Sequence, residues 1–283
     1  MKSSNITTQQ ILIAENEYWS KGYTVLKGIF SPEDVASWRK ECQRLWTLPG
    51  LLDDLNLRSE FRRNTSGTCI VDRLDPVVDI SPMLLDAVLD ARLLDPLEKI
   101  LRGPLSLLKC KLIRKSPNTG GYAQHQDFLY WRWLDMSADS LCSVGITLYP
   151  SNEESGGIEF FPGYHKALLP SADGNPNADF NIEQIDVSTG ETPELEPGDA
   201  LIFHALTPHR SGPNLSSHPR TLLLPSYAVT QQVDLYAKYY MREVARRCNE
   251  FVGFENYEMA LKAVSDRHVA RLGPRKQWNL KPR

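Results

Sequence analysis

Three consecutive residues near the middle of the chain, His125, Gln126 and Asp127, include the side chains best suited to chemistry. In an extended strand, side chains two positions apart point to the same face. We therefore expect the imidazole of His125 and the carboxylate of Asp127 to lie side by side. One nitrogen and one oxygen donor placed in this way can bind adjacent positions of a metal ion. A third ligand must then come from a distant segment that folds back beside them.

The histidines that follow Asp127 are the candidates for that third ligand. His165 comes straight after a Pro-Gly-Tyr turn, where a structural hydrogen bond is the expected role. His204 and His209 are five residues apart, so in one regular strand they would face opposite sides. Only one of the two can then reach the metal without a bulge.

The residues after His209 favour it over its rival. Ser211, a Gly-Pro-Asn turn and a polar loop lead to Arg220 at the start of a predicted strand, so the chain should return antiparallel to itself. This places a guanidinium one strand from the metal, and an arginine can hold a carboxylate through two parallel hydrogen bonds. Ser211 can add a hydroxyl donor on the same face. A metal with an anchored carboxylate at this distance fits a bound 2-oxo acid.

Two imidazoles and one carboxylate on one side of an ion leave adjacent coordination positions open. That arrangement is expected of non-haem Fe(II) oxygenases, whereas a structural zinc site is closed on all sides. The five cysteines are scattered, odd in number and without Cys-x-x-Cys spacing, which argues against thiolate zinc sites and disulfide frameworks. The donor set therefore predicts redox chemistry at iron.

Composition narrows the class of partner. The chain has 283 residues, 41% hydrophobic residues and a formal net charge of −3, with no block of lysine or arginine. These values are typical of a globular protein with a small-molecule partner, and not of a general nucleic-acid binder. The N-terminal residues lack a run of signal-peptide character, and no segment resembles a membrane span. We expect a soluble, cytoplasmic protein that binds neither nucleic acid nor membrane.

The first 103 residues should form helices and a first strand that pack on a core. We expect a helix over residues 6–21 that ends at Gly22, a strand over 23–30, a helix from the Ser31-Pro32 cap to about Trp46, mostly loop over 49–82, and helices over 86–101 divided by Pro96. These assignments rest on caps, on helix-breaking residues and on apolar periodicity.

Short strands separated by turns dominate from residue 104 to 230. The strands are predicted at residues 105–115, 141–149, 158–161, 200–203 and 221–229. This pattern predicts a mostly β fold with flanking helices, built on a double-stranded β-helix of the jelly-roll or cupin-like kind. Residues 231–283 read as helices that cover a sheet face, or that form a lid or a dimer contact. We expect one oxygenase domain over residues 1–283.

Several short motifs occur in a familiar order between residues 15 and 230. They are the Gly22-Tyr23 strand, the Ser31-Pro32-Glu33 helix start, His125-Gln126-Asp127, the turn at 154–157, Pro162-Gly163-Tyr164-His165, Pro197-Gly198-Asp199, the segment 209–214 and Arg220. Together they resemble the phytanoyl-CoA dioxygenase-like family of iron and 2-oxoglutarate-dependent oxygenases.

The resemblance implies a role for each matching residue. His125, Asp127 and His209 would be the iron ligands, and Arg220 with Ser211 would hold the far carboxylate of 2-oxoglutarate. Thr147, on a strand expected to line the barrel, is a further candidate for contact with that cosubstrate. Halogenating relatives are expected to lack the carboxylate ligand, so its presence points to oxygen transfer or desaturation.

Substrate-binding residues are sought next to the predicted metal ligands. Phe128, Tyr130 and Trp131 belong to an aromatic run that could form a substrate wall, with plain core packing as the alternative. Lys109 and Lys111 alternate onto one face and could hold an anion, although solvated lysines on an edge strand are the expected case. The polar loop around residue 175 could close over a substrate.

The predicted activity is that of a non-haem Fe(II) and 2-oxoglutarate-dependent dioxygenase. It would hydroxylate an unactivated C–H bond of a small free metabolite with O2 as second cosubstrate, releasing succinate and CO2. The same iron site could instead support desaturation, ring closure or epimerisation. A non-catalytic jelly-roll binding protein is the alternative from another class. A homodimer through the C-terminal helices is a further expectation.

Overall fold

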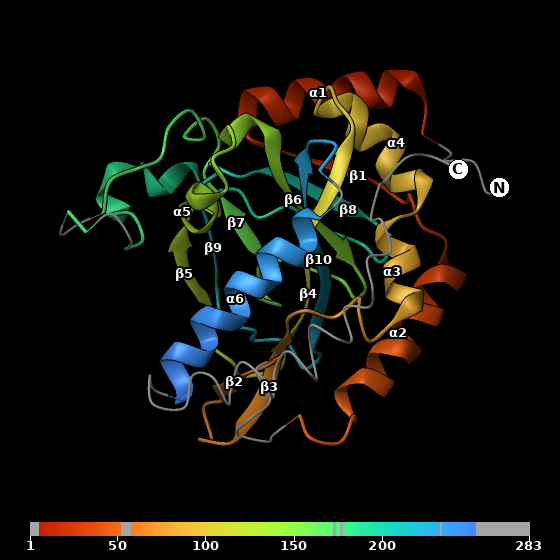
Figure 1. The fold of residues 1–283 in the computed structure, drawn as a ribbon, viewed down its shortest axis with the longest axis vertical. Helices are drawn as coiled ribbons and strands as arrows, with labels where there is room; N and C mark the ends of the chain where they lie inside the picture. Colours follow the sequence, from red (N-terminus) through yellow and green to blue (C-terminus); the bar gives the residue numbers. More distant parts are fainter. Residues whose placement is uncertain (1–5, 52–57, 172–173, 176–177, 233, 253–283) are drawn as a thin grey trace.

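The strands of the protein form two antiparallel sheets that pack against each other (Figure 1). The structure is a computed structural model that describes residues 6–51, 58–171, 174–175, 178–232 and 234–252. Within these ranges the strands are β1 (Tyr23–Leu26), β2 (Ser59–Arg63), β3 (Cys69–Leu74), β4 (Leu105–Lys115), β5 (Tyr122–His125), β6 (Leu141–Thr147), β7 (Ile158–Phe160), β8 (Ala200–His204), β9 (His209–Ser211) and β10 (Arg220–Val229). The larger sheet has the order β1-β8-β6-β10-β4-β3-β2, and the smaller has the order β5-β9-β7. The predicted double-stranded β-helix core is confirmed.

Strands β4 and β10 are long neighbours within the larger sheet. Their register places Arg220 opposite Lys115 and Ser226 opposite Lys109. Directly paired residues point to the same face of a sheet, so these four side chains share one face. Lys115 Nζ lies 2.7 Å from the hydroxyl of Ser211 in β9, which identifies this face as the one turned toward the smaller sheet.

Helices cover the other face of the larger sheet (Figure 1). They are α1 (Thr8–Lys21), α2 (Pro32–Trp46), α3 (Pro82–Val88) and α4 (Ala91–Ile100). The remaining α-helices are α5 (Phe128–Trp131) and α6 (Leu235–Val252). Short 3-10 helices are η1 (Arg132–Leu134), η2 (Ala138–Ser140), η3 (Ile182–Gln184) and η4 (Val187–Thr189). Of these elements, α5, η1 and α6 lie beside the cavity between the sheets.

Local sequence signals determine where the N-terminal helices begin and end. Ser31 and Asp34 form a reciprocal capping box at the start of α2, with Pro32 in the first turn, as the cap predicted. Gly22 ends α1 with a φ of +94°, a left-handed conformation that favours glycine. A Cβ at Gly22 would also lie 2.5 Å from the hydroxyl oxygen of Thr207, so the position is closed to larger residues.

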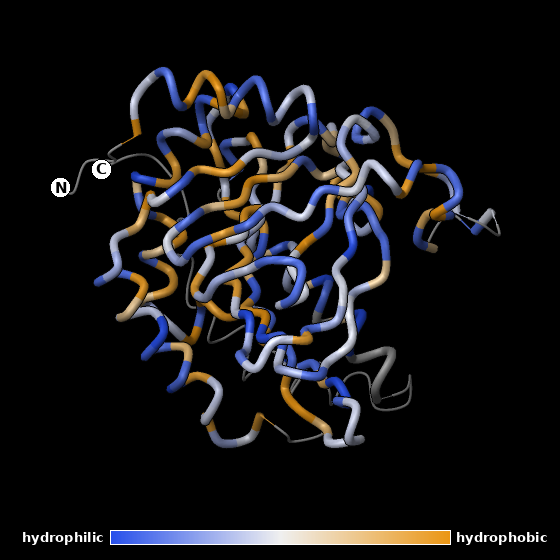
Figure 2. The backbone as a smooth tube through the Cα atoms, turned by 180° about the vertical axis from the view of Figure 1, so that it is seen from behind, coloured by the Kyte–Doolittle hydropathy of each residue, from blue (hydrophilic) through white to orange (hydrophobic). Residues whose placement is uncertain are grey.

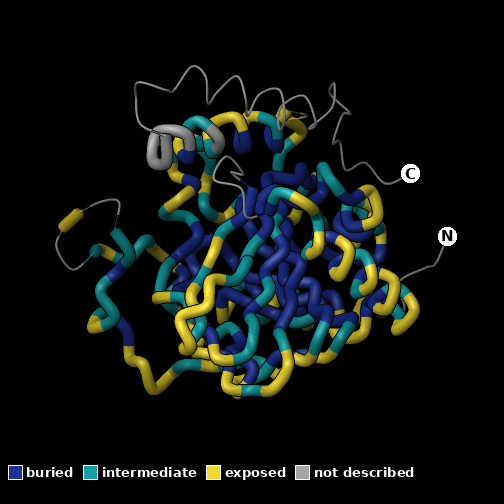
Figure 3. Tube along the Cα trace, turned by 90° about the horizontal axis from the view of Figure 1, so that it is seen from below, coloured by how far each residue is buried: buried dark blue, intermediate teal, exposed yellow. Residues whose placement is uncertain are grey.

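The hydrophobic core lies between the larger sheet and the helices that cover it. Figure 2 shows hydrophobic segments along the central strands and hydrophilic segments in the outer loops, and Figure 3 shows the buried residues gathered in the middle. Every residue of β6 is buried, because its outer face meets the helix layer and its inner face meets the cavity and the smaller sheet. Such a strand provides a rigid support for side chains between the sheets.

Two expectations about the fold need correction. The stretch 49–82, expected to be mostly loop, contains β2 and β3, which extend the larger sheet. Pro96 lies inside α4 and divides nothing, because the break comes at Asp90, whose carboxylate caps the start of α4 through the amide of Arg92. C-terminal to residue 231, α6 runs from Leu235 to Val252. The second predicted helix, over residues 257–270, lies outside the described residues.

Candidate metal centre and active site

The three predicted metal ligands meet between the two sheets. His125 and His209 are cross-strand partners in β5 and β9, and their ring centroids are 4.2 Å apart. Asp127 lies two residues after His125, and its Oδ1 is 3.8 Å from His125 Nε2. One ligand atom from each of the three residues lies within 4.8 Å of the other two. This is the separation that a single ion can bridge.

A turn, and not an extended strand, brings His125 and Asp127 together. Strand β5 ends at His125, and Asp127 has helical dihedral angles of −56° and −32° at the start of α5. Gln126 holds the turn: its amide nitrogen donates to the carbonyl oxygens of Ala167 (2.9 Å) and Leu206 (2.6 Å). The expectation that both ligands lie in one strand was therefore wrong, although both still face one point.

His204 and His209 do not compete for that point, because they lie in different sheets. Strand β8 ends at His204 in the larger sheet, and the chain crosses to the smaller sheet before His209. His204 lies 3.1 Å from a carboxylate oxygen of Asp139 and packs against the ring of Tyr18, away from the triad.

Hydrogen bonds orient both imidazoles for metal binding. Nδ1 of His125 lies 2.8 Å from the carbonyl oxygen of Ala123, and Nδ1 of His209 lies 2.9 Å from that of Thr207. Each Nδ1 therefore carries the proton, which leaves the Nε2 lone pair for a metal. Burial, together with the nearby His125, lowers the pKa of His209 to about 3, so this ring is neutral at physiological pH.

The carboxylate of Asp127 is ionised and firmly held. Burial acts to raise its pKa, but the electrostatic interactions of the carboxylate with His209, Lys109 and Lys111 keep this pKa below the usual range. Ser143 donates a hydrogen bond of 2.6 Å to Asp127 Oδ2, which leaves Oδ1 toward the imidazoles. Two imidazoles and one carboxylate suit Fe(II), and Ser143 is a positioning residue that sequence reasoning missed.

Arg220 and Thr147 present polar atoms that suit a carboxylate. Arg220 is 2% exposed, and its Nε and Nη1 atoms are buried with no hydrogen-bond partner among the described residues. The hydroxyl of Thr147 is likewise buried without such a partner. Thr147 pairs with Leu222, two residues from Arg220 in β10, so both groups point into the same space. These orphaned donors fit the distal carboxylate of a 2-oxo acid.

Lys115 is a further buried lysine at this end of the site, and it was not among the predicted site residues. Its Nζ donates to the carbonyl oxygens of Gly156 (2.9 Å) and Gly212 (2.7 Å) and to the hydroxyl of Ser211 (2.7 Å). Burial and the charge of Arg220 lower the pKa of Lys115 to about 6. Ser211 accepts this hydrogen bond and keeps its own hydroxyl hydrogen to donate to a ligand. The two-residue period that groups Lys109 with Lys111 also includes Lys115, a signal that could have found it.

A family model described as phytanoyl-CoA dioxygenase (PhyH) matches residues 18–222 of this chain, which include the triad, Thr147 and Arg220. The chain belongs to the phytanoyl-CoA dioxygenase family. The predicted resemblance is confirmed, and the protein is a non-haem Fe(II) and 2-oxoglutarate-dependent dioxygenase.

Relatives in this family act on different compounds. A methylphosphonate hydroxylase of Gimesia maris is 27% identical over 223 residues, which are 78% of this chain and 82% of the relative. A probable alpha-ketoglutarate-dependent hypophosphite dioxygenase of Stutzerimonas stutzeri is 26% identical over 223 residues, 76% of this chain and 77% of the relative. An ectoine dioxygenase of Nocardia farcinica is 24% identical over 218 residues, 71% of this chain and 72% of the relative.

Solved structures confirm the fold of this phytanoyl-CoA dioxygenase family member. The epimerase SnoN in complex with Fe3+, alpha ketoglutarate and nogalamycin RO superposes with a TM-score of 0.65 at 20% identity, over 80% of this chain and 86% of the other. EctD from S. alaskensis with 2-oxoglutarate and 5-hydroxyectoine gives 0.62 at 19% identity, over 81% and 78%. Within the described residues, no helix combines the length and apolar character needed to cross a bilayer.

A cavity of about 850 Å³ opens beside the triad. His125 and Asp127 line it on one side, and Tyr239, Arg242 and Glu243 of α6 line it on the other. In Figure 1, α6 crosses in front of the central strands. The cavity therefore has room for a small-molecule substrate next to the metal ligands.

Only one of the three predicted wall aromatics lines this cavity. Tyr130 is half-exposed at the cavity and donates a hydrogen bond of 2.8 Å to Asp179. Trp131 is fully buried in the hydrophobic core, and Phe128 packs against that core. The aromatic run forms α5, where successive side chains fan around the axis. Trp133, just beyond α5, is the second aromatic of this run at the cavity.

The expectation that Lys109 and Lys111 are solvated edge lysines was wrong. Strand β4 lies inside the larger sheet between β10 and β3, and Lys109 is only 7% exposed. Burial disfavours its charge, but Tyr239, Asp127 and Asp75 nevertheless raise the pKa of Lys109. Burial and the neighbouring Lys109 lower the pKa of Lys111 to about 7. Both lysines line the cavity.

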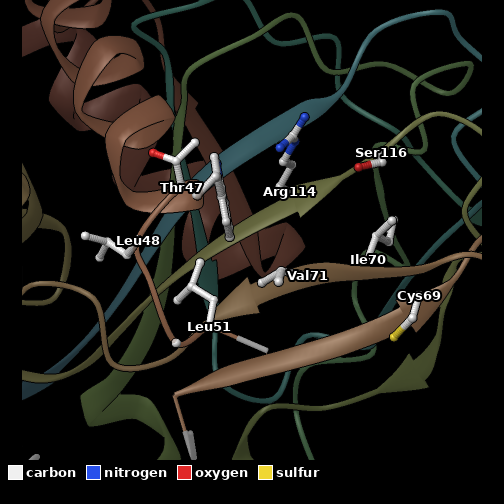
Figure 4. A pocket seen from close by; sticks show the side chains of 10 residues that line it. Thr47, Leu48, Leu51, Cys69, Ile70, Val71, Arg114 and Ser116 are labelled. Atoms are coloured by element: carbon white, nitrogen blue, oxygen red, sulfur yellow. The ribbon is translucent and has the colours of Figure 1, made fainter. Parts of the chain in front are cut away.

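A second cavity, of about 490 Å³, lies on the opposite face of β4 (Figure 4). The end of α2 and strand β3 supply most of its lining, including Leu48, Leu51 and Val71. Arg114 is the charged side chain that lines this cavity. Because adjacent residues of a strand point to opposite faces, Arg114 points away from the site that contains Lys115. This cavity contains none of the groups required for the chemistry described above.

Proposed function

We propose that the protein hydroxylates an unactivated C–H bond of a small free metabolite. The observation that carries this proposal is the meeting of His125, Asp127 and His209 at one point on the wall of a cavity of substrate size. In the proposal these three residues hold Fe(II), while Arg220, Thr147 and Ser211 hold the distal carboxylate of 2-oxoglutarate. When bound, the iron with 2-oxoglutarate and O2 supplies the oxidant for hydrogen removal, with release of succinate and CO2.

The protein's own contribution is geometry, charge and exclusion of water. Ser143 fixes one oxygen of Asp127, and two backbone carbonyls fix the tautomers of the imidazoles. Arg220 provides a buried positive charge that orients a dicarboxylate relative to the triad. Tyr130 and α6 bound the space in which the substrate C–H bond is presented.

Anaerobic titration tests this function in the full chain. Adding Fe(II) and then 2-oxoglutarate should give a weak metal-to-ligand absorption band, and a screen of candidate metabolites should find compounds that stimulate succinate formation. Replacing Asp127 by Ala should abolish both signals. A wild-type protein that gives neither band nor succinate would instead be a non-catalytic jelly-roll binding protein.

The iron site also suits desaturation, ring closure or epimerisation, and product analysis separates these outcomes from hydroxylation. The epimerase SnoN shares the fold, and the curated relatives named above include a hydroxylase of methylphosphonate. We favour hydroxylation on the basis of those relatives.

Five further expectations stay predictions. They are a single oxygenase domain, a cytoplasmic location, lack of nucleic-acid binding, a homodimer through C-terminal helices and closure of the loop at Asn175.

A further inference from the structure

The wall of the active-site cavity carries an excess of positive charge. Seven lysine and arginine side chains line it, against five aspartate and glutamate side chains. Fe(II) brings two positive charges and 2-oxoglutarate brings two negative charges. Binding of both Fe(II) and 2-oxoglutarate therefore leaves the excess of positive charge unchanged, and a further anion must balance it.

The acidic side chains of the cavity are already engaged. Glu60, Asp75 and Glu243 pair with arginines, Asp179 accepts from Tyr130, and Asp127 belongs to the triad. Among the described residues, the cations that make no ion pair with a carboxylate include Lys109, Lys111 and Arg242. Of these three, Lys109 is the buried one, and Asp127 and Asp75 favour its charge without forming an ion pair with it. A buried cation that lacks a paired anion is costly, so such a group at an active site indicates a missing ligand.

Lys109 lies close to the triad. It pairs in register with Ser226, whose hydroxyl is 3.1 Å from Ser143, the residue that donates to Asp127. Its Nζ is 5.3 Å from the ring centroid of Trp131 and 5.6 Å from that of Tyr239. The ammonium group is thus held between two aromatic rings beside the metal ligands, and within the described part of the chain it makes no hydrogen bond.

A row of side chains continues outward from Lys109 to α6. The ring of Tyr239 stacks on Trp133 with centroids 6.3 Å apart, and the guanidinium of Arg242 lies 4.3 Å above Trp133. The row therefore has a cation at each end and an aromatic pair between them. Tyr239 and Arg242 belong to α6, which lies C-terminal to the segment 18–222 that the family model matches.

We infer that the primary substrate is a small oxyanion, a carboxylate or a phosphonate, whose charged group binds Lys109 against Tyr239. Arg242 supplies the second positive charge at the outer end of the row and draws the anion into the cavity. Binding at Lys109 places the remainder of the molecule beside His125 and Asp127. This inference rests on the proposed function and adds the chemical class of its substrate.

Matched compounds test the inference in the Fe(II)-loaded full chain with 2-oxoglutarate. Propylphosphonate, butanoate and 1-butanol share a short alkyl chain and differ in their charge. Either or both anions should perturb the anaerobic absorption band and stimulate succinate formation at least ~10-fold more than the alcohol. The stronger anion distinguishes a phosphonate from a carboxylate site. Equal or greater stimulation by the alcohol overturns the inference.

Substitutions on α6 supply a matched pair of variants. Arg242→Gln removes the outer charge of the row, and Lys238→Gln removes an exposed charge from the same helix outside the cavity. We expect Arg242→Gln to raise KM for the anion about 5- to 10-fold and to reduce its salt dependence, with KM for 2-oxoglutarate unchanged. Lys238→Gln should leave both constants unchanged. Equal effects of the two variants overturn the role of Arg242.

Lys109→Met tests the inner end of the row. We expect at least a ~10-fold rise in KM for the anion, partly restored by Lys109→Arg, with 2-oxoglutarate binding to the Fe(II) protein unchanged. A rise in KM for 2-oxoglutarate with unchanged KM for the anion would assign Lys109 to the cosubstrate and overturn the inference. If Lys109→Met does not fold, the exposed Arg242 variant decides the outcome.

The failure of this inference can be told from failure of the proposed function. A wild-type protein with the absorption band and succinate formation, but with preference for neutral compounds, refutes only the anionic substrate. A wild-type protein without band or succinate formation refutes the oxygenase activity and the inference together.

Discussion

Arg220 offers the sharpest test of how the cosubstrate is held. Its guanidinium is 2% exposed and two of its nitrogens lack partners among the described residues, so two charge-assisted hydrogen bonds to a carboxylate are available. Such bonds contribute about 1.5 kcal/mol each at the low end of their range, or about 3 kcal/mol together. At 1.4 kcal/mol per decade, Arg220→Met should weaken 2-oxoglutarate binding by about 100-fold.

Thermal unfolding of the Fe(II) protein measures this loss without turnover. At a 2-oxoglutarate concentration 100 times the wild-type Kd, the ligand stabilises the wild type by about 2.7 kcal/mol and the variant by only about 0.4 kcal/mol. A chain of this size gains about 2–4 °C per kcal/mol, so the ligand-induced Tm shift should fall from several degrees to about one.

The variant should keep its stability without 2-oxoglutarate, because it removes a buried charge that has few partners. Burial already lowers the pKa of Arg220 to about 10, which shows that the folded protein disfavours this charge. Arg114→Gln, on the outer face of β4, is the matched control and should keep the full ligand-induced shift. A wild-type Tm shift in Arg220→Met would refute the assignment of this residue to the cosubstrate.

Three further predictions concern support of the site and of the fold. Ser143→Ala removes the hydrogen bond to Asp127 and should weaken Fe(II) binding about 10-fold in a competition titration, with little change in 2-oxoglutarate affinity. Gly121→Ala places a Cβ 1.8 Å from a carbonyl oxygen of β9 and should lower both Tm and iron affinity, whereas Gly120→Ala, which meets nothing within 4 Å, should change neither. Although partial burial opposes it, an ion pair with an α4 arginine lowers the pKa of Asp34 to about 2. This depressed pKa adds stability above pH 4 that is lost as pH falls toward 2. Urea unfolding should therefore show Asp34→Asn to be about 1 kcal/mol less stable than the wild type at pH 7, with the difference vanishing near pH 2.

Local sequence signals were sufficient where neighbouring residues determine the conformation. The Ser31-Pro32 cap and Gly22 predicted the ends of two helices, because capping depends on a few adjacent backbone groups. The long apolar alternation predicted β4 and β10 almost to the residue. The two strands within 49–82 were not predicted: β2 pairs with β3, and β3 gains its second partner only from β4, which lies further along the chain.

The sequence predicted which three side chains meet between the sheets, but it did not predict the local structure that brings them together. The donor types at His125, Asp127 and His209 are visible in sequence, but the turn that joins the first two depends on Gln126 contacts more than 40 residues away. The place of α6 beside the cavity depends equally on tertiary contacts, such as the hydrogen bond between Tyr240 and Asp75. Periodicity carries no information about such long-range contacts.

The separation of α6 from the metal ligands has a consequence for how new specificities arise. The groups that would handle iron and cosubstrate end with Arg220, whereas the outer wall is supplied by a helix that begins at Leu235. A recombination event, or a designed graft, that exchanges the segment after β10 replaces this part of the recognition surface and leaves the metal ligands unchanged. Such modular exchange allows one oxidising centre to serve chemically unlike compounds.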